Sequence, residues 1–458
     1  MHIENGFSRR LRKVGLMAFC CLALATGWSG GVEAKAGKPE TAEFTLANGL
    51  QVLVIPDHRA PVVTQMVWYR VGSIDETPGK TGLAHFLEHL MFKGTKKLAP
   101  GDFSAIVARN GGEDNAFTSM DYTGFYEQIA VDRLPLVMGM EADRMQNLQL
   151  SDQEVMPERK VVLEELGMRV ENNPGAILSI RMNKVLYGAH PYGTPTIGWR
   201  PEVEKLGTAD ALAFYHRFYT PNNAILVVVG DVTPAQIKKL VDEKFGPLKP
   251  TAQANRRTIP EVAPLTKSTT VEYRDARVTQ PVWQRSWLAA NYRENEKDAF
   301  ALQVFSQILG GGSTSRLYRS LVMQDKIAAD AGSSYDGSSY YRSEFAIYVV
   351  PISEKNIPAI NDRVEALAGE IAKDGVKPEE LERAKTLLVS SAVYNRDEQM
   401  GLANLYGAAL ATGLTASQVD TWPDGIRAVS AADVKAVAQN YVAGKYAVTG
   451  LLLPEKSQ

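Results

Sequence analysis

The chain contains two closely similar octapeptides. Residues 63–70 read VTQMVWYR and residues 278–285 read VTQPVWQR, so six of eight positions are identical at an offset of 215. Both stretches are β-branched and aromatic, as strands of a sheet are. A segment with helical spacing follows each of them, which favours internal duplication over a chance match. We therefore expect two related halves that each build a sheet of their own.

The length and the linker composition agree with this division. At 458 residues the chain is too long for one ordinary domain. Residues 247–264 read PLKPTAQANRRTIPEVAP, and such a proline-rich polar stretch is typical of a linker. The predicted layout is an N-terminal domain over residues 41–250, a linker over 251–265 and a homologous C-terminal domain without metal over 266–458.

Local patterns predict individual elements of the first half. Asn48-Gly49 splits two apolar runs in residues 44–57, which is a hairpin signal. Further strands are expected at 62–71, 118–129 and 224–229, and helices near 82–92, 105–110, 134–148, 151–170 and 209–218.

Residues 1–36 have the layout of a secretory signal peptide. A basic start precedes the apolar run of residues 14–28, and small residues around Ala36 fit a cleavage site. The apolar run is too short to span a bilayer comfortably, so an uncleaved membrane anchor is the weaker alternative. Both cysteines, Cys20 and Cys21, lie inside this segment. The mature chain is therefore predicted to be exported, most simply to a bacterial periplasm, and to contain neither disulfides nor thiolate chemistry.

The charge balance argues against a nucleic-acid partner. The full chain has 50 basic and 52 acidic residues, a formal charge of -2. Removal of residues 1–36 leaves 45 basic and 50 acidic residues, a charge of about -5. Proteins that bind nucleic acid usually carry a basic surface instead.

The segment HFLEH carries the clearest chemical signal. His85 and His89 are four residues apart in an apolar stretch, so on a helix they lie on one face and can reach the same ion. Glu88 lies beside the second histidine, in the H-x-x-E-H order of the inverted zinc motif. Imidazole nitrogens suit Zn²⁺, and we predict one zinc ion per chain. In the second half, core-like residues fill the places that the octapeptide offset assigns to this trio.

A catalytic zinc needs a third protein ligand, and an anionic one is natural beside two neutral histidines. The segment SDQEVMPERKVVLEELGMRV offers Glu154, Glu158, Glu164 and Glu165. Ser151 and Glu154 form a capping-box pattern, which gives Glu154 a structural role. Glu158 and Glu165 share one helical face, whereas Glu164 points about 100° away from Glu165. Spacing alone does not choose between the two faces.

Seven segments spread over most of the mature chain resemble the pitrilysin and mitochondrial processing peptidase family of zinc metallopeptidases. They are TLANGLQVLV, LEHLMFKGT, NAFTSMDYTGFYE, ERKVVLEE, HPYGTPTIG, FYTPNNAILVVVGDV and LGGGSTSRLYRSL. The resemblance implies an α+β fold of two homologous repeats, each a sheet packed by helices on one side. Such a chain would form half of a clam-like chamber.

The resemblance also implies roles for particular residues. Glu165 would be the third zinc ligand and Glu158 a supporting acid. Asn115 and Ala116 would belong to an edge strand that receives the peptide substrate. The expected activity is that of an exported zinc metalloendopeptidase acting on peptides or small unfolded proteins. Zinc would activate a water, with Glu88 as the general base.

One family feature is missing. Members of this family usually place an arginine and a tyrosine, seven residues apart, after the glycine-rich turn of the C-terminal half. Here those places hold Val322 and Ala329, which have no side-chain donor. We therefore expect a homologous partner subunit that supplies the pair, in a heterodimer or, alternatively, a homodimer. The competing interpretation is a peptide-binding or structural subunit without catalysis.

Overall fold

The computed structural model describes residues 41–251, 257, 259 and 261–456. Residues 39–458 form one unit, and every contact discussed below lies within it. The predicted signal segment, residues 1–36, and most of the predicted linker lie outside the described residues. Among the described helices, none is long and apolar enough to cross a bilayer.

The first half builds a six-stranded sheet in the order β1-β2-β6-β3-β5-β4. The expected hairpin is present, with Gly49 in the left-handed region at φ +88°, where glycine is favoured. The single strand expected over residues 118–129 is wrong, because residues 119–122 turn the chain and leave two antiparallel strands. The strands are β1 (Ala42–Thr45), β2 (Gln51–Pro56), β3 (Val62–Tyr69), β4 (Glu113–Thr118), β5 (Thr123–Ala130) and β6 (Ala224–Gly230).

Helices of the same half cover one face of this sheet and form its main core. They are α1 (Leu83–Leu90), α2 (Asp102–Arg109), α3 (Leu134–Asn147), α4 (Asp152–Leu166), α6 (Arg200–Val203), α7 (Thr208–Phe218) and α8 (Pro234–Lys244). A π-helical turn, Gly167–Glu171, continues α4, so the helix expected over 151–170 is present with a change of pitch at its end.

The second half repeats this topology. Its five strands follow the order β7-β11-β8-β10-β9, and only the β7–β11 pair is parallel, just as only β2–β6 is in the first sheet. The prediction of two homologous α+β repeats is therefore confirmed. The strands are β7 (Thr269–Asp275), β8 (Val282–Ala289), β9 (Ala328–Tyr335), β10 (Ser343–Pro351) and β11 (Val448–Pro454). The helices are α9 (Glu296–Gly310), α10 (Ile357–Asp374), α11 (Pro378–Asn395), α12 (Gln399–Ala411), α13 (Ala416–Ala428) and α14 (Ala431–Val437).

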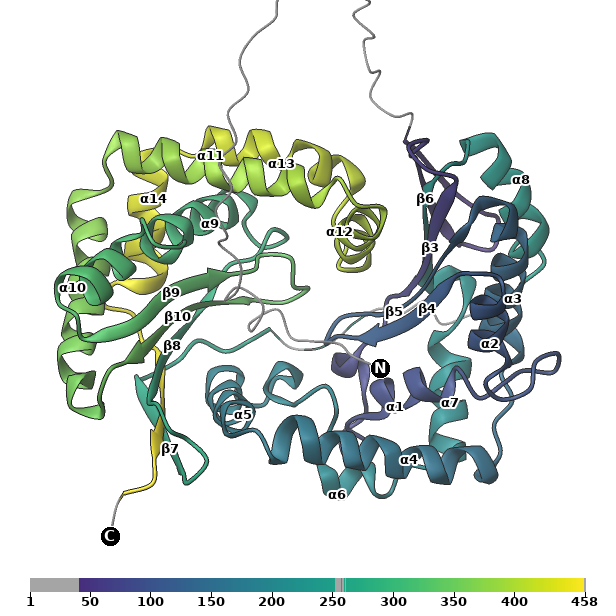
Figure 1. Cartoon of the computed structure of the whole chain (residues 1–458), viewed down its shortest axis with the longest axis horizontal. Helices are drawn as coiled ribbons and strands as arrows, with labels where there is room; N and C mark the ends of the chain where they lie inside the picture. The colour runs from purple at the N-terminus through teal and green to yellow at the C-terminus, as the bar shows by residue number, and fades with distance from the viewer. Residues whose placement is uncertain (1–40, 252–256, 258, 260, 457–458) are drawn as a thin grey trace, which may run out of the picture. The chain divides into compact units, whose positions relative to one another are not determined.

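One helix from each half packs on the sheet of the other half (Figure 1). Helix α12 packs on the second face of the first sheet, against β3 and β6. Helix α5 (Pro174–Tyr187) packs in the same way on β7, β8 and β11. Gly407 of α12 lies so close to the buried Trp68 of β3 that a Cβ at this position would sit 2.1 Å from the indole. A repeat's own helices thus cover one side of its sheet, as expected, and the exchanged helix covers the other.

The octapeptide match that suggested the duplication is out of register. Trp68 of β3 faces the exchanged helix α12, whereas Trp283 of β8 faces the second half's own helices. An odd offset of 215 therefore pairs residues on opposite faces, because side chains alternate along a strand with a period of two. The repeat is real, but the octapeptide offset does not give its residue-by-residue correspondence along the strands.

Arg257 joins the two halves from within the linker. Its guanidinium is buried and pairs with Asp75, after β3, and with Asp121, in the β4–β5 turn. It also lies 4.7 Å from the ring centroid of Tyr340, between β9 and β10. The linker thus contributes a buried cation to the interior of the fold.

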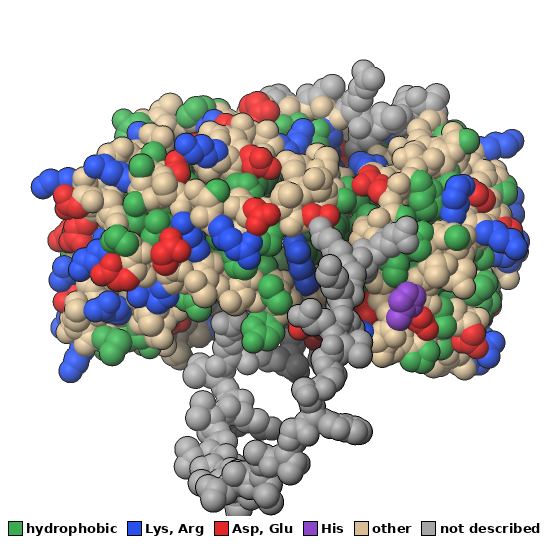
Figure 2. Space-filling model, turned by 90° about the horizontal axis from the view of Figure 1, so that it is seen from above, with side chains coloured by type: hydrophobic (Ala, Val, Ile, Leu, Met, Phe, Trp, Pro, Cys, Tyr) green, Lys and Arg blue, Asp and Glu red, His purple; other side chains and the backbone are tan. Residues whose placement is uncertain are grey.

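The surface carries charges of both signs. Lys, Arg, Asp and Glu side chains are intermixed on the face shown in Figure 2. This mixture agrees with the small net charge of the sequence.

Candidate metal centre

Helix α1 holds the HFLEH segment in the interior of the first half. All eight of its residues are buried. Gly82 starts the helix at φ +85°, and the carboxylate of Glu76 accepts hydrogen bonds from the backbone N–H groups of Gly82 and Ala84. A half-buried carboxylate that caps the first turn satisfies donors that would otherwise have no partner. The helix therefore begins at a defined residue, which sets the direction of every side chain that follows.

His85, His89 and Glu165 converge from two helices. The two imidazole rings lie 4.8 Å apart. Glu165 Oε2 lies 3.7 Å from His85 Nε2 and 3.3 Å from His89 Nε2. Among the described residues this is the set of three whose possible ligand atoms all lie within 4.8 Å of one another. Glu164, the alternative that spacing left open, is exposed.

The spacing and the donor set fit a tetrahedral zinc ion. Zinc bonds to nitrogen and oxygen of about 2.0–2.2 Å place the ligand atoms of a tetrahedron roughly 3.3–3.6 Å apart. The distance from Glu165 to His89 lies at the lower end of this range, and the distance to His85, 3.7 Å, lies just above it. Two imidazoles and one carboxylate would leave the fourth position for water or substrate, as a catalytic site requires.

Two cations and one carboxylate hold these candidate ligands. Glu158 Oε1 lies 2.8 Å from His89 Nδ1, and Lys93 Nζ lies 2.5 Å from Glu158 Oε2. Arg169 donates to Glu165 Oε1 at 2.5 Å, which leaves Oε2 facing the histidines. With its proton on Nδ1, His89 would present a bare Nε2 lone pair to a metal.

The electrostatics prepare the cluster for a cation. Burial, together with the neighbouring His89, lowers the pKa of His85 to about 4, so its imidazole is neutral. Burial opposes the charge of His89, but the carboxylates of Glu158 and Glu165 raise its pKa to about 9. Burial likewise opposes ionisation of Glu165, yet hydrogen bonding to His89 and the nearby cations lower its pKa to about 2. A metal ion would therefore displace a proton from His89 and keep the carboxylate of Glu165 charged.

Glu88 points to the strand at the sheet edge. Thr118 Oγ1, at the end of β4, donates a 2.5 Å hydrogen bond to Glu88 Oε2. Burial raises the pKa of Glu88 to about 7, and the bond from Thr118 opposes that rise. A carboxylate with such a pKa suits proton transfer near neutral pH.

Strand β4 ends the first sheet, so one of its sides has no neighbouring strand among the described residues. It carries Asn115 and Ala116, the residues that the resemblance assigns to substrate binding. Asn115 Oδ1 accepts a hydrogen bond from the Ala116 N–H at 2.8 Å. An edge of this kind is where an extended peptide can add to a sheet.

Two protein-family models match the chain. The model described as "Insulinase (Peptidase family M16)" matches residues 51–199, and the model described as "Peptidase M16 inactive domain" matches residues 205–388. The zinc protease PqqE of Helicobacter pylori is 31% identical over 402 residues, which cover 86% of this chain and 88% of that protein. The chain belongs to peptidase family M16. The resemblance inferred from the sequence is thereby confirmed.

Solved structures of similar proteins share the fold of this M16 chain. The crystal structure of a protease from Helicobacter pylori matches with a TM-score of 0.82 at 29% identity, covering 91% of this chain and 100% of that one. The periplasmic protease PqqL from Escherichia coli matches with a TM-score of 0.76 at 18% identity. That match covers 90% of this chain and 47% of PqqL, and at such identity it shows the fold alone.

The positions of the missing arginine and tyrosine lie in the second half. Val322 is partly buried against the second core, in the π-helical segment Tyr318–Gln324. Ala329 is exposed on β9. Tyr335, a nearby residue that could have served instead, donates its hydroxyl to the Ala290 carbonyl at 2.5 Å. Its donor is therefore already used within the fold.

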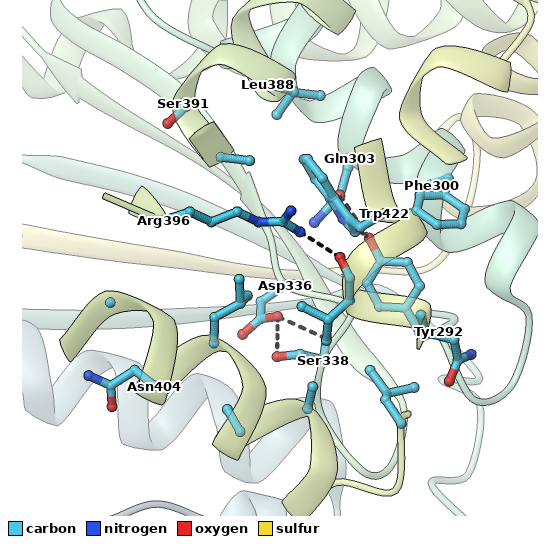
Figure 3. A pocket seen from close by; sticks show the side chains of 18 of the residues that line it. Tyr292, Phe300, Gln303, Asp336, Ser338, Leu388, Ser391, Arg396, Asn404 and Trp422 are labelled. Carbon is cyan, nitrogen blue, oxygen red and sulfur yellow. Dashed lines mark hydrogen bonds between the residues drawn. The ribbon is translucent and has the colours of Figure 1, made fainter. Parts of the chain in front are cut away.

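A separate cavity of about 740 Å³ lies among α9, α11, α12 and α13 (Figure 3). Tyr292, Phe300 and Trp422 form an aromatic wall, and the Trp422 indole N–H donates to the Tyr292 hydroxyl at 2.8 Å. Arg396 donates across the cavity to the backbone carbonyl of Val419. None of the candidate metal ligands lines this space, so the cavity is not the metal centre.

The sequence analysis did not identify three residues that contact the candidate metal centre. Arg169 could have been found, because it lies four residues after Glu165 on the same helical face. Lys93 and Thr118 reach Glu158 and Glu88 from distant parts of the chain. Their contacts are set by packing, which no local pattern reports.

Proposed function

We propose that this M16 protein is a zinc metalloendopeptidase that hydrolyses peptides or small unfolded proteins. One observation carries the proposal: His85, His89 and Glu165 converge within ligand distance, and Glu88 lies on the same helical turn as the two histidines. Structural roles do not require this set of residues in a buried position. The names of similar proteins as zinc proteases support the assignment.

His85 Nε2, His89 Nε2 and Glu165 Oε2 would hold the zinc ion. When bound there, zinc supplies Lewis acidity, which lowers the pKa of a water and polarises a scissile carbonyl. Glu88 accepts the proton that the attacking water loses and later donates it to the leaving amine. Glu158 keeps the proton of His89 on Nδ1, so that Nε2 stays free to bind.

The free edge of β4 would hold the substrate. Main-chain hydrogen bonds from an extended peptide to the strand around Asn115 and Ala116 would align the scissile carbonyl beside Glu88. Such main-chain bonds do not depend on the side chains of the peptide. We therefore infer that substrates are selected by their length and by their lack of folded structure. A digest of short peptides that shows tight sequence preference would contradict this part of the proposal.

The missing donor pair leads us to propose a partner. Val322 and Ala329 cannot donate a side-chain hydrogen bond to substrate, so a homologous subunit would contribute an arginine and a tyrosine. A heterodimer is proposed, with a homodimer as the alternative. Peptidase rates of the purified chain, measured alone and after mixing with such a subunit, test this. A full rate from the lone chain that mixing leaves unchanged would refute it.

We also propose export, with residues 1–36 as a cleaved signal peptide. The sequence pattern of that segment supports it. Cell fractionation and N-terminal sequencing of the mature protein provide the test, and a cytoplasmic chain that retains Met1 would exclude it.

Metal analysis and peptide hydrolysis test the activity together. We expect one zinc per folded chain, lost in Glu165→Gln and retained in Glu88→Gln and in Glu164→Gln, which changes an exposed acid next to the ligand. Glu88→Gln should lower hydrolysis by about 100-fold or more, because general base catalysis is typically worth 10²–10⁴-fold. Absence of zinc, or normal zinc binding by Glu165→Gln, would refute the site. The non-catalytic alternative is worth testing because the arginine and tyrosine donors are missing. It would be favoured if neither wild type nor any variant hydrolysed peptides and if Glu88→Gln left peptide binding unchanged.

A further inference from the structure

Thr118 connects the edge strand to the carboxylate of Glu88. It is the last residue of β4, and its hydroxyl donates to Glu88 Oε2 at 2.5 Å. No hydrogen bond to the other oxygen of Glu88 comes from the described part of the chain. One carboxylate oxygen is therefore held and the other is free to take a proton.

The position of Thr118 is rigidly determined. It pairs with Thr123 across the β4–β5 hairpin, and the Ser119 N–H closes the turn on the Tyr122 carbonyl at 2.8 Å. The same turn is tied to the chain after β3, because the Ser73 N–H donates to the Ser119 carbonyl. Asp121, buried in this turn, pairs with the linker through Arg257. A hydroxyl anchored in this way cannot follow a carboxylate that moves, so it fixes the direction of that carboxylate.

The strand alternation separates the two tasks of β4. Ala116 contributes to the core beneath α1, whereas Phe117 packs on the α12 side. Thr118 is two residues after Ala116 and therefore faces α1 and Glu88. No strand of the described residues pairs with the outer edge of β4, so its main-chain groups are available to a peptide there. One strand can thus hold a substrate in its plane and orient Glu88 from its face.

We propose that Thr118 is a positioning residue that orients Glu88 through this hydrogen bond, so that the strand receiving the peptide also aims the general base. The inference rests on the proposed peptidase function and assigns to it a residue that the HFLEH motif does not contain. It predicts that the alignment of Glu88 depends on a hydroxyl at position 118 and on nothing else in that side chain.

The test compares Thr118→Val, which keeps the shape and removes the donor, with Thr118→Ser, which restores it. Misaligned catalytic groups cost up to about 100-fold, so Thr118→Val should lower kcat by about 10- to 100-fold. KM should stay within about twofold of wild type and zinc content should be unchanged, because the strand and the metal ligands are intact. Thr118→Ser should recover most of the rate. A wild-type kcat for Thr118→Val, or a failure of the serine to restore activity, would overturn the proposal.

Thr123→Val is the matched control. It removes a buried hydroxyl from the paired position of the same hairpin, but that hydroxyl donates to the Val71 carbonyl and not to Glu88. We expect a lowered unfolding midpoint with kcat within about twofold of wild type. An equal loss of kcat in both valine variants would mean that the hairpin's stability, and not the bond to Glu88, matters.

A double-mutant cycle tests the contact without any activity. Shifts in the unfolding midpoint are compared for Thr118→Val, which removes the donor, Glu88→Leu, which removes the acceptor, and the double variant of the metal-free protein. Non-additive shifts are expected for two residues in contact. Additive shifts would show that the two side chains do not interact, which would refute the proposal. If Glu88→Gln abolishes hydrolysis while Thr118→Val does not slow it, the proposed function stands and the positioning role fails. If the wild-type protein neither binds zinc nor cleaves peptides with its partner, the proposed function fails, and the cycle still decides the contact.

Discussion

Removal of the Glu158 carboxylate should weaken zinc binding without touching a zinc ligand. Glu158 Oε1 lies 2.8 Å from His89 Nδ1, and its second oxygen holds Lys93. The side chain is only 13% exposed, so water replaces it poorly. Glu158→Ala would leave a buried imidazole N–H and an ammonium group without their acceptor. Glu158→Gln keeps one neutral acceptor and loses the charge.

The magnitude follows from the nature of this contact. A hydrogen bond to a charged group contributes about 1.5–3 kcal/mol. Loss of a carboxylate that orients a metal-binding histidine typically costs 10- to 100-fold in metal affinity, or about 1.4–2.7 kcal/mol. The two ranges agree, so we expect zinc affinity to fall by about 100-fold in Glu158→Ala and by about 10-fold in Glu158→Gln. His89 carries the effect, since His85 Nδ1 has no hydrogen-bond partner among the described residues.

Competition with a chromophoric zinc chelator measures these affinities directly. Glu164→Ala is the control, because it removes an exposed acid from the same helix and so reports any general effect of charge. Circular dichroism should show that all variants remain folded. Zinc affinity of Glu158→Ala within twofold of wild type would refute the argument that this carboxylate orients His89. An equal loss in Glu164→Ala would point instead to the overall charge of the helix.

Three further predictions concern the fold. Gly407→Ala places a methyl group about 2.1 Å from the Trp68 indole and should destabilise the protein by about 1–3 kcal/mol. Gly369→Ala is a helical control with open space around it and should not destabilise the protein. Equal melting temperatures of the two variants would contradict the tight packing of α12. Arg257→Met removes a buried cation that pairs with Asp75 and Asp121 and should lower the free energy of unfolding by about 3–5 kcal/mol in denaturant titrations. Unchanged stability would show that the linker contact is dispensable. Burial lowers the pKa of His190 to about 4, so the folded state holds it neutral. The free energy of unfolding that comes from keeping His190 neutral is fully present above pH 6.5. It is lost as the pH falls towards 4, by up to about 1.4 kcal/mol per pH unit. His190→Asn, which keeps an acceptor for the local backbone N–H, should reduce that slope in unfolding titrations by one proton, and an unchanged slope would contradict the assignment.

Local rules were sufficient where the relevant atoms are close in sequence. The i, i+4 spacing of His85 and His89 placed both imidazoles on one face of a helix, and they lie side by side in the structure. The Asn48-Gly49 turn was correct for the same reason, because the short loop between β1 and β2 depends on the backbone freedom of its own Gly49. Spacing also grouped Glu158 with Glu165, although it left Glu164 open as the alternative ligand.

Patterns failed where a residue's partner is distant. The octapeptide match was out of register by an odd number of residues, since identity of letters does not reveal which face of a strand is buried. The expected single strand over residues 118–129 overlooked a turn whose Ser119 and Asp121 are held by contacts with other segments. Thr118 and Glu88 are 30 positions apart, so no periodicity relates them.

The sequence by itself determined the chemistry that this protein offers: two histidines and a glutamate on one turn, a supply of acids on a second helix, and a chain built from two related halves. Helical spacing left Glu164 and Glu165 both open, and the tertiary structure brings Glu165, the acid that the family resemblance implied, to the histidines. Tertiary structure alone decided which cations hold that acid and which strand orients Glu88. It also decided that each half lends a helix to the other's sheet. The reason is physical. Helical spacing is a local property of the backbone, whereas the approach of two helices and a strand depends on the packing of cores assembled from residues far apart in the chain.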